Sequence, residues 1–171
     1  MGYLKELGKK PRVDEFKDKL VIQKTVCLLE LSGIKLGYTF SLYVRGPYSP
    51  GLTKDMYNNK EMVNKLQTDY IPNAHEKQLL HTISDLSNGL DPILLEIMST
   101  YAYFIRELRY EEKMAITSLK KLKPFYSEGR IAVGVSRAKQ LFFKPTEKEM
   151  EMMKTEFNEW QESSLTDRNK E

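Results

Sequence analysis

The sequence predicts a mainly α-helical single domain, a helical bundle with one short β-element near residues 38–44. Its 171 residues, 40% hydrophobic and 30% charged, suit one domain with its own core. Apolar residues recur at helical spacing along most of the chain, whereas residues 38–44 alternate at period two. We expect six or seven helices within a single domain at residues 13–161. A flexible basic arm at residues 1–12 precedes it and a polar, frayed tail at residues 162–171 follows it.

The first helix is expected over residues 15–32, with Asp14 as its N-cap and Gly33 as a left-handed C-cap. Between residues 20 and 31 it is apolar almost all round, and only four residues interrupt the run: Gln23, Lys24, Thr25 and Glu30. A helix that is apolar on most faces must be covered on most faces. We therefore expect this helix at the centre of the core, with the single cysteine, Cys27, as a small buried hydrophobe.

The most informative stretch runs from Tyr38 to Gly51. Aromatic and β-branched residues favour a strand up to Val44, and the prolines of Gly46-Pro47 and Ser49-Pro50-Gly51 are expected to end its hydrogen-bond ladder. The result is a stiff, aromatic loop that carries one cation, Arg45, and holds no general base, nucleophile or metal ligand. Such a loop suits recognition. The alternative is a rigid connection whose tyrosines only pack under a neighbouring helix.

Four further helices follow in the middle of the chain. Residues 52–66 predict one peripheral helix, or two short ones bent near Asn58-Asn59, and residues 74–87 predict an amphipathic helix. Asp91-Pro92 is a strong helix start, and the apolar spacing continues to Leu108, so this helix is expected to pack directly against the first. Residues 111–123 predict the next helix, which Pro124 closes.

The C-terminal region leaves two alternatives open. Ser127 caps a helix with apolar positions from Ile131 to Phe142, but the glycines and valines at residues 130–135 also allow a strand. Thr146 and Glu149 form a capping box before a last helix. Its apolar stripe comprises Met150, Met153, Phe157 and Trp160. This stripe docks within the chain or, as an alternative, across a homodimer.

Catalytic and metal-binding signatures are missing from the sequence. The two histidines, His75 and His81, are six residues apart and so lie on different faces of one helix. No phosphate-binding loop, nucleophile elbow or paired-carboxylate motif is present. The longest apolar stretch, residues 93–105, is too short for a bilayer and is interrupted by Glu96. We expect a cytoplasmic protein that is not an enzyme, holds no cofactor or metal and has no membrane partner.

Charge is distributed unevenly. Residues 106–144 hold ten Lys or Arg against four Asp or Glu, whereas residues 145–171 hold four against eight. One interpretation is that these are ordinary solvated helix faces. The alternative is a winged-helix-like, nucleic-acid-binding protein that contacts phosphates through this basic segment. The residues proposed for that role are Lys120, Lys121, Lys123, Arg130, Arg137 and Lys139. A pI of only about 8.8 and the acidic tail count against it.

A family resemblance rests on residues 19–24, on residues 28–30 and on residues 40–49. Gln23 and Lys24 on a hydrophobic helix, followed by an aromatic segment that ends in Gly46-Pro47-Tyr48, resemble the YwgA-like group of uncharacterised prokaryotic proteins. More distantly the chain is similar to Panacea (SocA-like) antitoxin domains. The resemblance covers about residues 16–58 and is weaker up to residue 125. It implies a protein that binds other proteins, often as an antitoxin, and it supplies no catalytic residues.

Together these observations predict a non-catalytic protein-interaction module, antitoxin-like or regulatory. The residues expected to contact the partner are Tyr43, Arg45, Tyr48 and Tyr57, because aromatic residues and arginine carry much of the energy of interfaces. The identity of the partner does not follow from the sequence.

Overall fold

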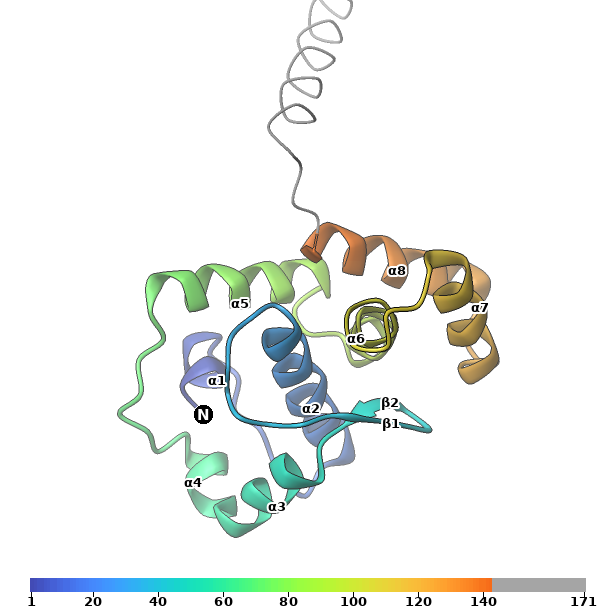
Figure 1. The fold of residues 1–171 in the computed structure, drawn as a ribbon. Coiled ribbons are helices and arrows are strands. Elements are labelled where there is room, and N and C mark those ends of the chain that lie inside the picture. The colour runs from blue at the N-terminus through green and yellow to red at the C-terminus, as the bar shows by residue number, and fades with distance from the viewer. Residues whose placement is uncertain (143–171) are drawn as a thin grey trace, which may run out of the picture.

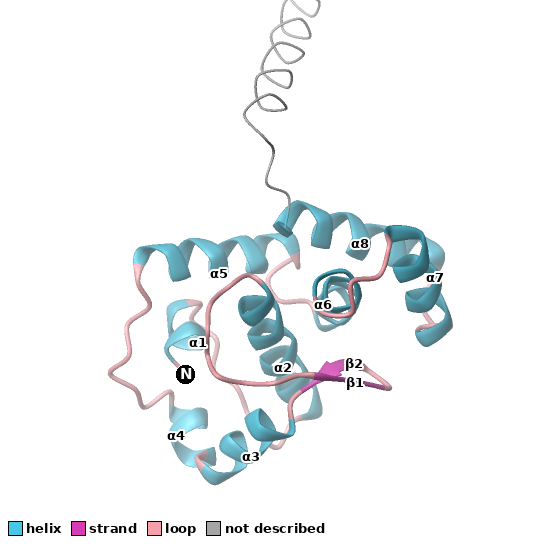
Figure 2. Cartoon of the chain, in the orientation of Figure 1, coloured by secondary structure: helices cyan, strands magenta, loops and turns pink. Residues whose placement is uncertain are grey.

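Eight helices and one β-hairpin make up residues 1–142, the part of the chain that the computed structural model describes (Figures 1 and 2). In chain order the elements are α1 (Gly2–Glu6), α2 (Phe16–Leu31), β1 (Ser41–Tyr43), β2 (Gly46–Tyr48), α3 (Pro50–Asn58), α4 (Lys60–Lys65), α5 (Ala74–Leu86), α6 (Pro92–Arg106), α7 (Glu112–Leu122) and α8 (Glu128–Phe142). The mainly α-helical prediction is confirmed. The predicted capping box at Thr146, the apolar stripe from Met150 to Trp160 and the tail lie outside the described residues.

Helices α2 and α6 form the centre of the fold, as predicted from their apolar runs. They pack against each other, and α6 also packs against α8, which crosses above it in Figure 1. Both helices contribute completely buried side chains to the main core, among them Leu28, Leu29, Leu95, Ile97 and Met98. Asp91 caps α6 by accepting hydrogen bonds from two backbone amides of the first turn, at 3.1 and 2.9 Å.

Residues 130–135 belong to helix α8, so the strand alternative is wrong. Ser127 accepts a hydrogen bond from the Arg130 amide, at 3.3 Å, as expected of a cap. A small residue is needed where α8 crosses α6, because a Cβ built on Gly134 would lie 2.3 Å from the side chain of Ile97. That contact explains why a glycine is tolerated inside a helix.

Replacing Gly134 with Ala is therefore expected to destabilise the protein by about 1–3 kcal/mol, because the added methyl group overpacks the α6–α8 crossing. Gly129, in the same helix, is a matched control, since no atom lies within 4 Å of its built Cβ. Gly129→Ala is expected to stabilise the protein by about 0.5–1 kcal/mol through helix propensity. Urea unfolding of both variants checks the pair. Equal effects of the two substitutions would contradict the close crossing.

The N-terminal segment differs from the expected flexible arm. Residues 2–6 form helix α1, which is tied to α5 by hydrogen bonds and ion pairs. The Tyr3 hydroxyl donates to Glu76, at 2.9 Å, and Lys77 forms an ion pair with Glu6, at 3.0 Å. Leu4 enters a second hydrophobic cluster that lies beside α3 and α4. The physical reason for the difference is tertiary, because five residues are too short for a stable helix alone.

The β-element is shorter than the predicted strand at residues 38–44, and it has a partner. Strands β1 and β2 pair antiparallel, with Leu42 opposite Pro47 and Tyr43 opposite Gly46. The prediction that Gly46-Pro47 ends the ladder is wrong. Val44 and Arg45 form the turn that reverses the chain, and Gly46 follows it with a φ of +83°. A two-stranded ribbon tolerates the missing amide donor of Pro47.

The remaining helices agree with the alternatives stated from the sequence. The segment predicted as one helix or two forms the two short helices α3 and α4, which together cover residues 50–65 and meet at Asn59. Helices α5 and α7 end within two residues of their expected bounds. No helix within residues 1–142 combines the length and the apolar character needed to cross a bilayer.

Candidate functional site

Two polar side chains of α2 hold the hairpin by hydrogen bonds to its backbone. Gln23 uses both ends of its amide: its Nε2 donates to the Ser49 carbonyl, at 2.9 Å, and its Oε1 accepts from the Ser49 amide, at 3.0 Å. The next residue, Lys24, donates from Nζ to the Pro47 carbonyl, at 2.7 Å. Both side chains are 3% exposed. Buried backbone groups that lack a sheet partner are satisfied in this way.

A buried ion pair supports the other side of the hairpin. Lys123, at the end of α7, pairs with Glu96 of α6, and both side chains are almost completely buried. Lys123 Nζ also donates to the Val44 carbonyl, at 3.2 Å, and Arg45 lies 3.5 Å from the Glu96 carboxylate. Burial lowers the pKa of Lys123, and the hydrogen bond to Glu96 opposes this change. The ion pair therefore joins α6 and α7 to the tip of the hairpin.

Two further residues of α6 complete the support. Tyr103 donates from its hydroxyl to the Phe40 carbonyl, at 3.0 Å, just before β1. Thr100 lies so close to β2 that a Cβ built on Gly46 would be 2.1 Å from its Oγ1 atom. Gly46 is thus required twice, for its positive φ and for this close approach.

Lys24 is the most perturbed cation of the site. Its hydrogen-bond acceptor within residues 1–142, the Pro47 carbonyl, carries no full charge. Desolvation by burial lowers the pKa of Lys24 to about 8, and the positive charges of Lys123 and Arg45 lower it further while Cys27 and Glu96 oppose the change. A single buried carboxylate, Glu96, thus faces three basic side chains beneath the hairpin, and the site is electropositive.

A groove of about 450 Å³ opens between the hairpin, the first half of α2 and helix α3. Its lining comprises Phe16, Lys19, Leu20, Gln23, Lys24, Tyr43, Val44, Arg45, Gly46, Tyr48, Thr53 and Tyr57. The four residues predicted to contact a partner, Tyr43, Arg45, Tyr48 and Tyr57, all line this one groove. The structure thus brings together residues that are up to 14 positions apart in the sequence.

Aromatic rings and cations contact one another in the groove. The Arg45 guanidinium lies over the Phe16 ring, at 5.2 Å, and the Tyr43 and Tyr48 rings meet edge to face, also at 5.2 Å. Lys19 donates from Nζ to the Tyr57 hydroxyl, at 2.7 Å. The lining has three cationic side chains and no Asp or Glu among the residues that the structure describes. This combination favours a ligand that is both anionic and apolar.

Phe16 and Lys19 belong to the groove but were not predicted. Phe16 is 59% exposed, which is unusual for a large aromatic side chain. With Leu20 and Gln23 they lie at positions i, i+3, i+4 and i+7 of α2, so they share one helix face. That spacing is visible in the sequence and could have identified the α2 wall of the groove.

The basic segment proposed for nucleic acid does not present all of its predicted residues. Lys123 is buried against Glu96, so its assignment as a phosphate contact is wrong for this structure. Lys120 pairs with Glu128, at 2.8 Å, and Lys139 pairs with Glu112. Lys121 and Arg130 are exposed, and Arg137 is half-buried. The surface of α7 and α8 is therefore less basic than the sequence suggests.

The cysteine and histidine side chains do not form a reactive or metal-binding site in the described part of the chain. Burial raises the pKa of the Cys27 thiol to about 12, as expected for an unreactive core cysteine. His81 lies on the surface, 3.6 Å from Glu6. In the described part of the chain, no three His, Cys, Asp or Glu side chains lie close enough together to hold a metal ion.

The chain matches no protein-family model, no curated protein and no solved structure. The resemblance to YwgA-like proteins and Panacea domains therefore stays a prediction. Its two halves do meet in space, because Gln23 and Lys24 bind the backbone of Ser49 and Pro47.

Proposed function

We propose that the protein is a non-catalytic interaction module that binds an acidic segment of another protein in the hairpin groove. One observation carries this proposal: aromatic side chains and three cations line a single groove without an acidic residue from the described part of the chain. Aromatic residues and arginine dominate the energetics of interfaces. Complementary charge adds specificity and speeds association.

The support beneath the hairpin favours binding without rearrangement. Gln23, Lys24 and Lys123 fix the backbone on which Tyr43, Arg45 and Tyr48 are carried. A surface that is already ordered loses less conformational entropy on association. The exposed apolar side chains around the groove also suit a contact that removes them from water, namely Phe16, Leu42, Tyr43, Val44 and Tyr57.

The family resemblance suggests what kind of protein the partner is. An antitoxin-like role makes the partner a toxin, and a regulatory role makes it another cellular protein. Both roles use the same groove and need no reaction. They differ only in the identity of the bound chain, which a capture experiment determines.

The test compares three tagged proteins in affinity capture from the cells that make them: wild type, Phe16→Ala with Tyr57→Ala, and Phe125→Ala. Phe125 is a matched control, because it is as exposed as Phe16, at 59%, and does not line the groove. We expect wild type and control to retain a discrete protein after nuclease treatment. The groove variant is expected to lose at least about 90% of it, since two interface anchors together contribute more than about 2 kcal/mol.

Two results would count against the proposal. Undiminished capture of the same protein by the Phe16→Ala, Tyr57→Ala variant would show that the groove is not the interface. Recovery of nucleic acid that is released at high salt would transfer the function to the basic segment of α7 and α8.

A further inference from the structure

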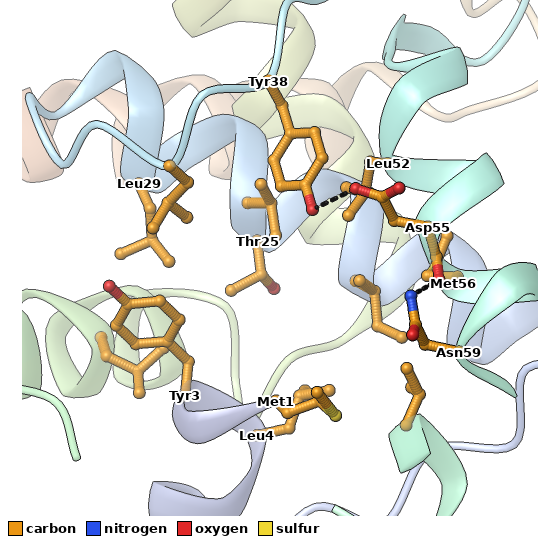
Figure 3. Close-up of a pocket in the computed structure, with 15 residues that line it drawn as sticks. Met1, Tyr3, Leu4, Thr25, Leu29, Tyr38, Leu52, Asp55, Met56 and Asn59 are labelled. Carbon is orange, nitrogen blue, oxygen red and sulfur yellow. Dashed lines mark hydrogen bonds between the residues drawn. The ribbon is translucent and has the colours of Figure 1, made fainter. Parts of the chain in front are cut away.

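A second cavity, of about 460 Å³, lies on another side of α2 and shares no residue with the hairpin groove (Figure 3). Helices α2 and α3 line it with matching stripes at positions i, i+3, i+4 and i+7. These are Ile22, Thr25, Val26 and Leu29 on α2, and Leu52, Asp55 and Met56 on α3 together with its C-cap residue Asn59. Side chains of α1, α4, α5 and residues 36–38 complete the wall. Two helix faces thus point toward a space that they do not fill.

Thr25 is the unusual member of this lining. It is 3% exposed, and its Oγ1 atom has no hydrogen-bond partner among residues 1–142. The other polar groups shown in Figure 3 are satisfied: the Tyr38 hydroxyl donates to Asp55, at 3.0 Å, and Asn59 donates to the Asp55 carbonyl, at 3.0 Å. A buried hydroxyl without a partner is destabilising, so its presence in a cavity wall calls for an explanation.

We propose that this cavity binds a small, uncharged and mainly apolar molecule whose single hydroxyl or carbonyl group hydrogen-bonds to Thr25. The volume falls within the range of small-molecule sites. The lining is mostly aliphatic and contains no Lys or Arg, whereas Asp55 stands at its edge. Met1 also belongs to the lining, and burial lowers the pKa of its α-amino group, which favours the uncharged form of that group. A charged ligand would lose its hydration in this mainly aliphatic space, so an uncharged ligand with one polar atom suits it best.

The surrounding packing gives such a ligand a physical role. Leu52, Met56 and Val63 belong to the second hydrophobic cluster and also line the cavity. On the cavity side these side chains lack the dispersion contacts that a filled core supplies. Met1, Asp55 and Asn59 are exposed, so the cavity has a route to solvent. An apolar ligand restores the missing contacts and enters without unfolding the chain.

The test uses the neutral fluorophore N-phenyl-1-naphthylamine, displaced by 1-octanol or by octanoate at neutral pH. We expect fluorescence enhancement, displacement by 1-octanol, and at least about tenfold weaker displacement by octanoate, because no Lys or Arg of the lining offsets the cost of taking its carboxylate out of water. In spectra of ¹³C-methyl-labelled Met, 1-octanol is expected to shift the Met56 methyl signal. The Met56 signal assigns binding to this cavity, because Met56 lines the cavity and does not line the hairpin groove.

Thr25→Val separates the role of the hydroxyl from that of the cavity, since it keeps the shape of the side chain. We expect 1-octanol to bind about two- to tenfold more weakly, because one hydrogen bond is lost. The thermal midpoint is expected to be equal or higher, because an unpartnered buried hydroxyl is removed. Thr117→Val, on the exposed face of α7, is expected to leave the affinity unchanged. Absence of fluorophore binding, or an unchanged affinity for 1-octanol in Thr25→Val, would overturn the proposal.

Discussion

Glu96→Leu is expected to destabilise the protein by about 3–5 kcal/mol, the largest effect that we predict. The substitution leaves the Lys123 ammonium buried without its carboxylate partner, next to Arg45. A charge that is removed from water without compensation costs far more than a lost surface ion pair. Urea unfolding monitored by circular dichroism measures the effect.

Two further variants identify the cause. Combining Glu96→Leu with Lys123→Met replaces the pair by apolar groups and is expected to recover most of the lost stability. Glu112→Leu breaks the exposed pair with Lys139 and is expected to change stability by no more than about 1 kcal/mol. If the double variant were no more stable than Glu96→Leu alone, loss of packing rather than an unpaired charge would explain the result.

The two central helices were predictable because their own side chains dictate their environment. Residues 20–31 and 93–105 are apolar on most faces, so each helix had to lie inside the fold. Asp91-Pro92 specifies the start of α6 through a cap and a fixed φ angle. These signals are local, and the tertiary contacts of both helices agree with them.

The hairpin and α1 were not predictable in the same way, because both depend on contacts between distant segments. Pro47 argues against a strand in isolation, but its carbonyl is bound by Lys24, 23 residues earlier. Helix α1 is short and is held by Tyr3 and Glu6 against α5. No local pattern contains this information.

The candidate site was predictable in part. The loop composition indicated Tyr43, Arg45, Tyr48 and Tyr57, and the structure places them around one groove, although partner binding itself stays a prediction. The buried charges were missed. Lys24 and Glu96 each interrupt an otherwise apolar helix, which is a visible sign that a charge is buried and needs a partner. Lys123 gives no such sign, since it lies among other lysines at a helix end.

The second large effect concerns pH and Lys24. The lysine pKa is about 8 in the folded protein, against an ordinary value of 10.5. Between these two values the unfolded chain binds more protons than the folded one, so this group makes stability rise with pH. The pKa difference corresponds to at most about 3 kcal/mol. Below pH 8 the buried charge lowers the free energy of unfolding by this full amount, and above pH 10.5 it no longer lowers it.

Comparing wild type with Lys24→Met isolates this contribution, because groups such as Cys27 titrate in both proteins. We expect the stability of wild type relative to Lys24→Met to increase between pH 8 and pH 10.5. A ¹³Cε titration of Lys24 should show a midpoint near pH 8. A constant stability difference over this range, or a midpoint near 10.5, would contradict the buried-charge interpretation.

The same titration links the support of the hairpin to the proposed groove. Lys24 both binds the Pro47 carbonyl and lines the groove, where it is one of three cationic side chains. Its deprotonation above pH 8 removes positive charge from the binding surface. An acidic partner segment is therefore expected to dissociate more readily at pH 9 than at pH 7. Over the same range the free energy of unfolding is expected to rise, because the buried amine loses its charge. The two opposite trends follow from one amine, because the charge that favours the partner is the charge that the interior disfavours.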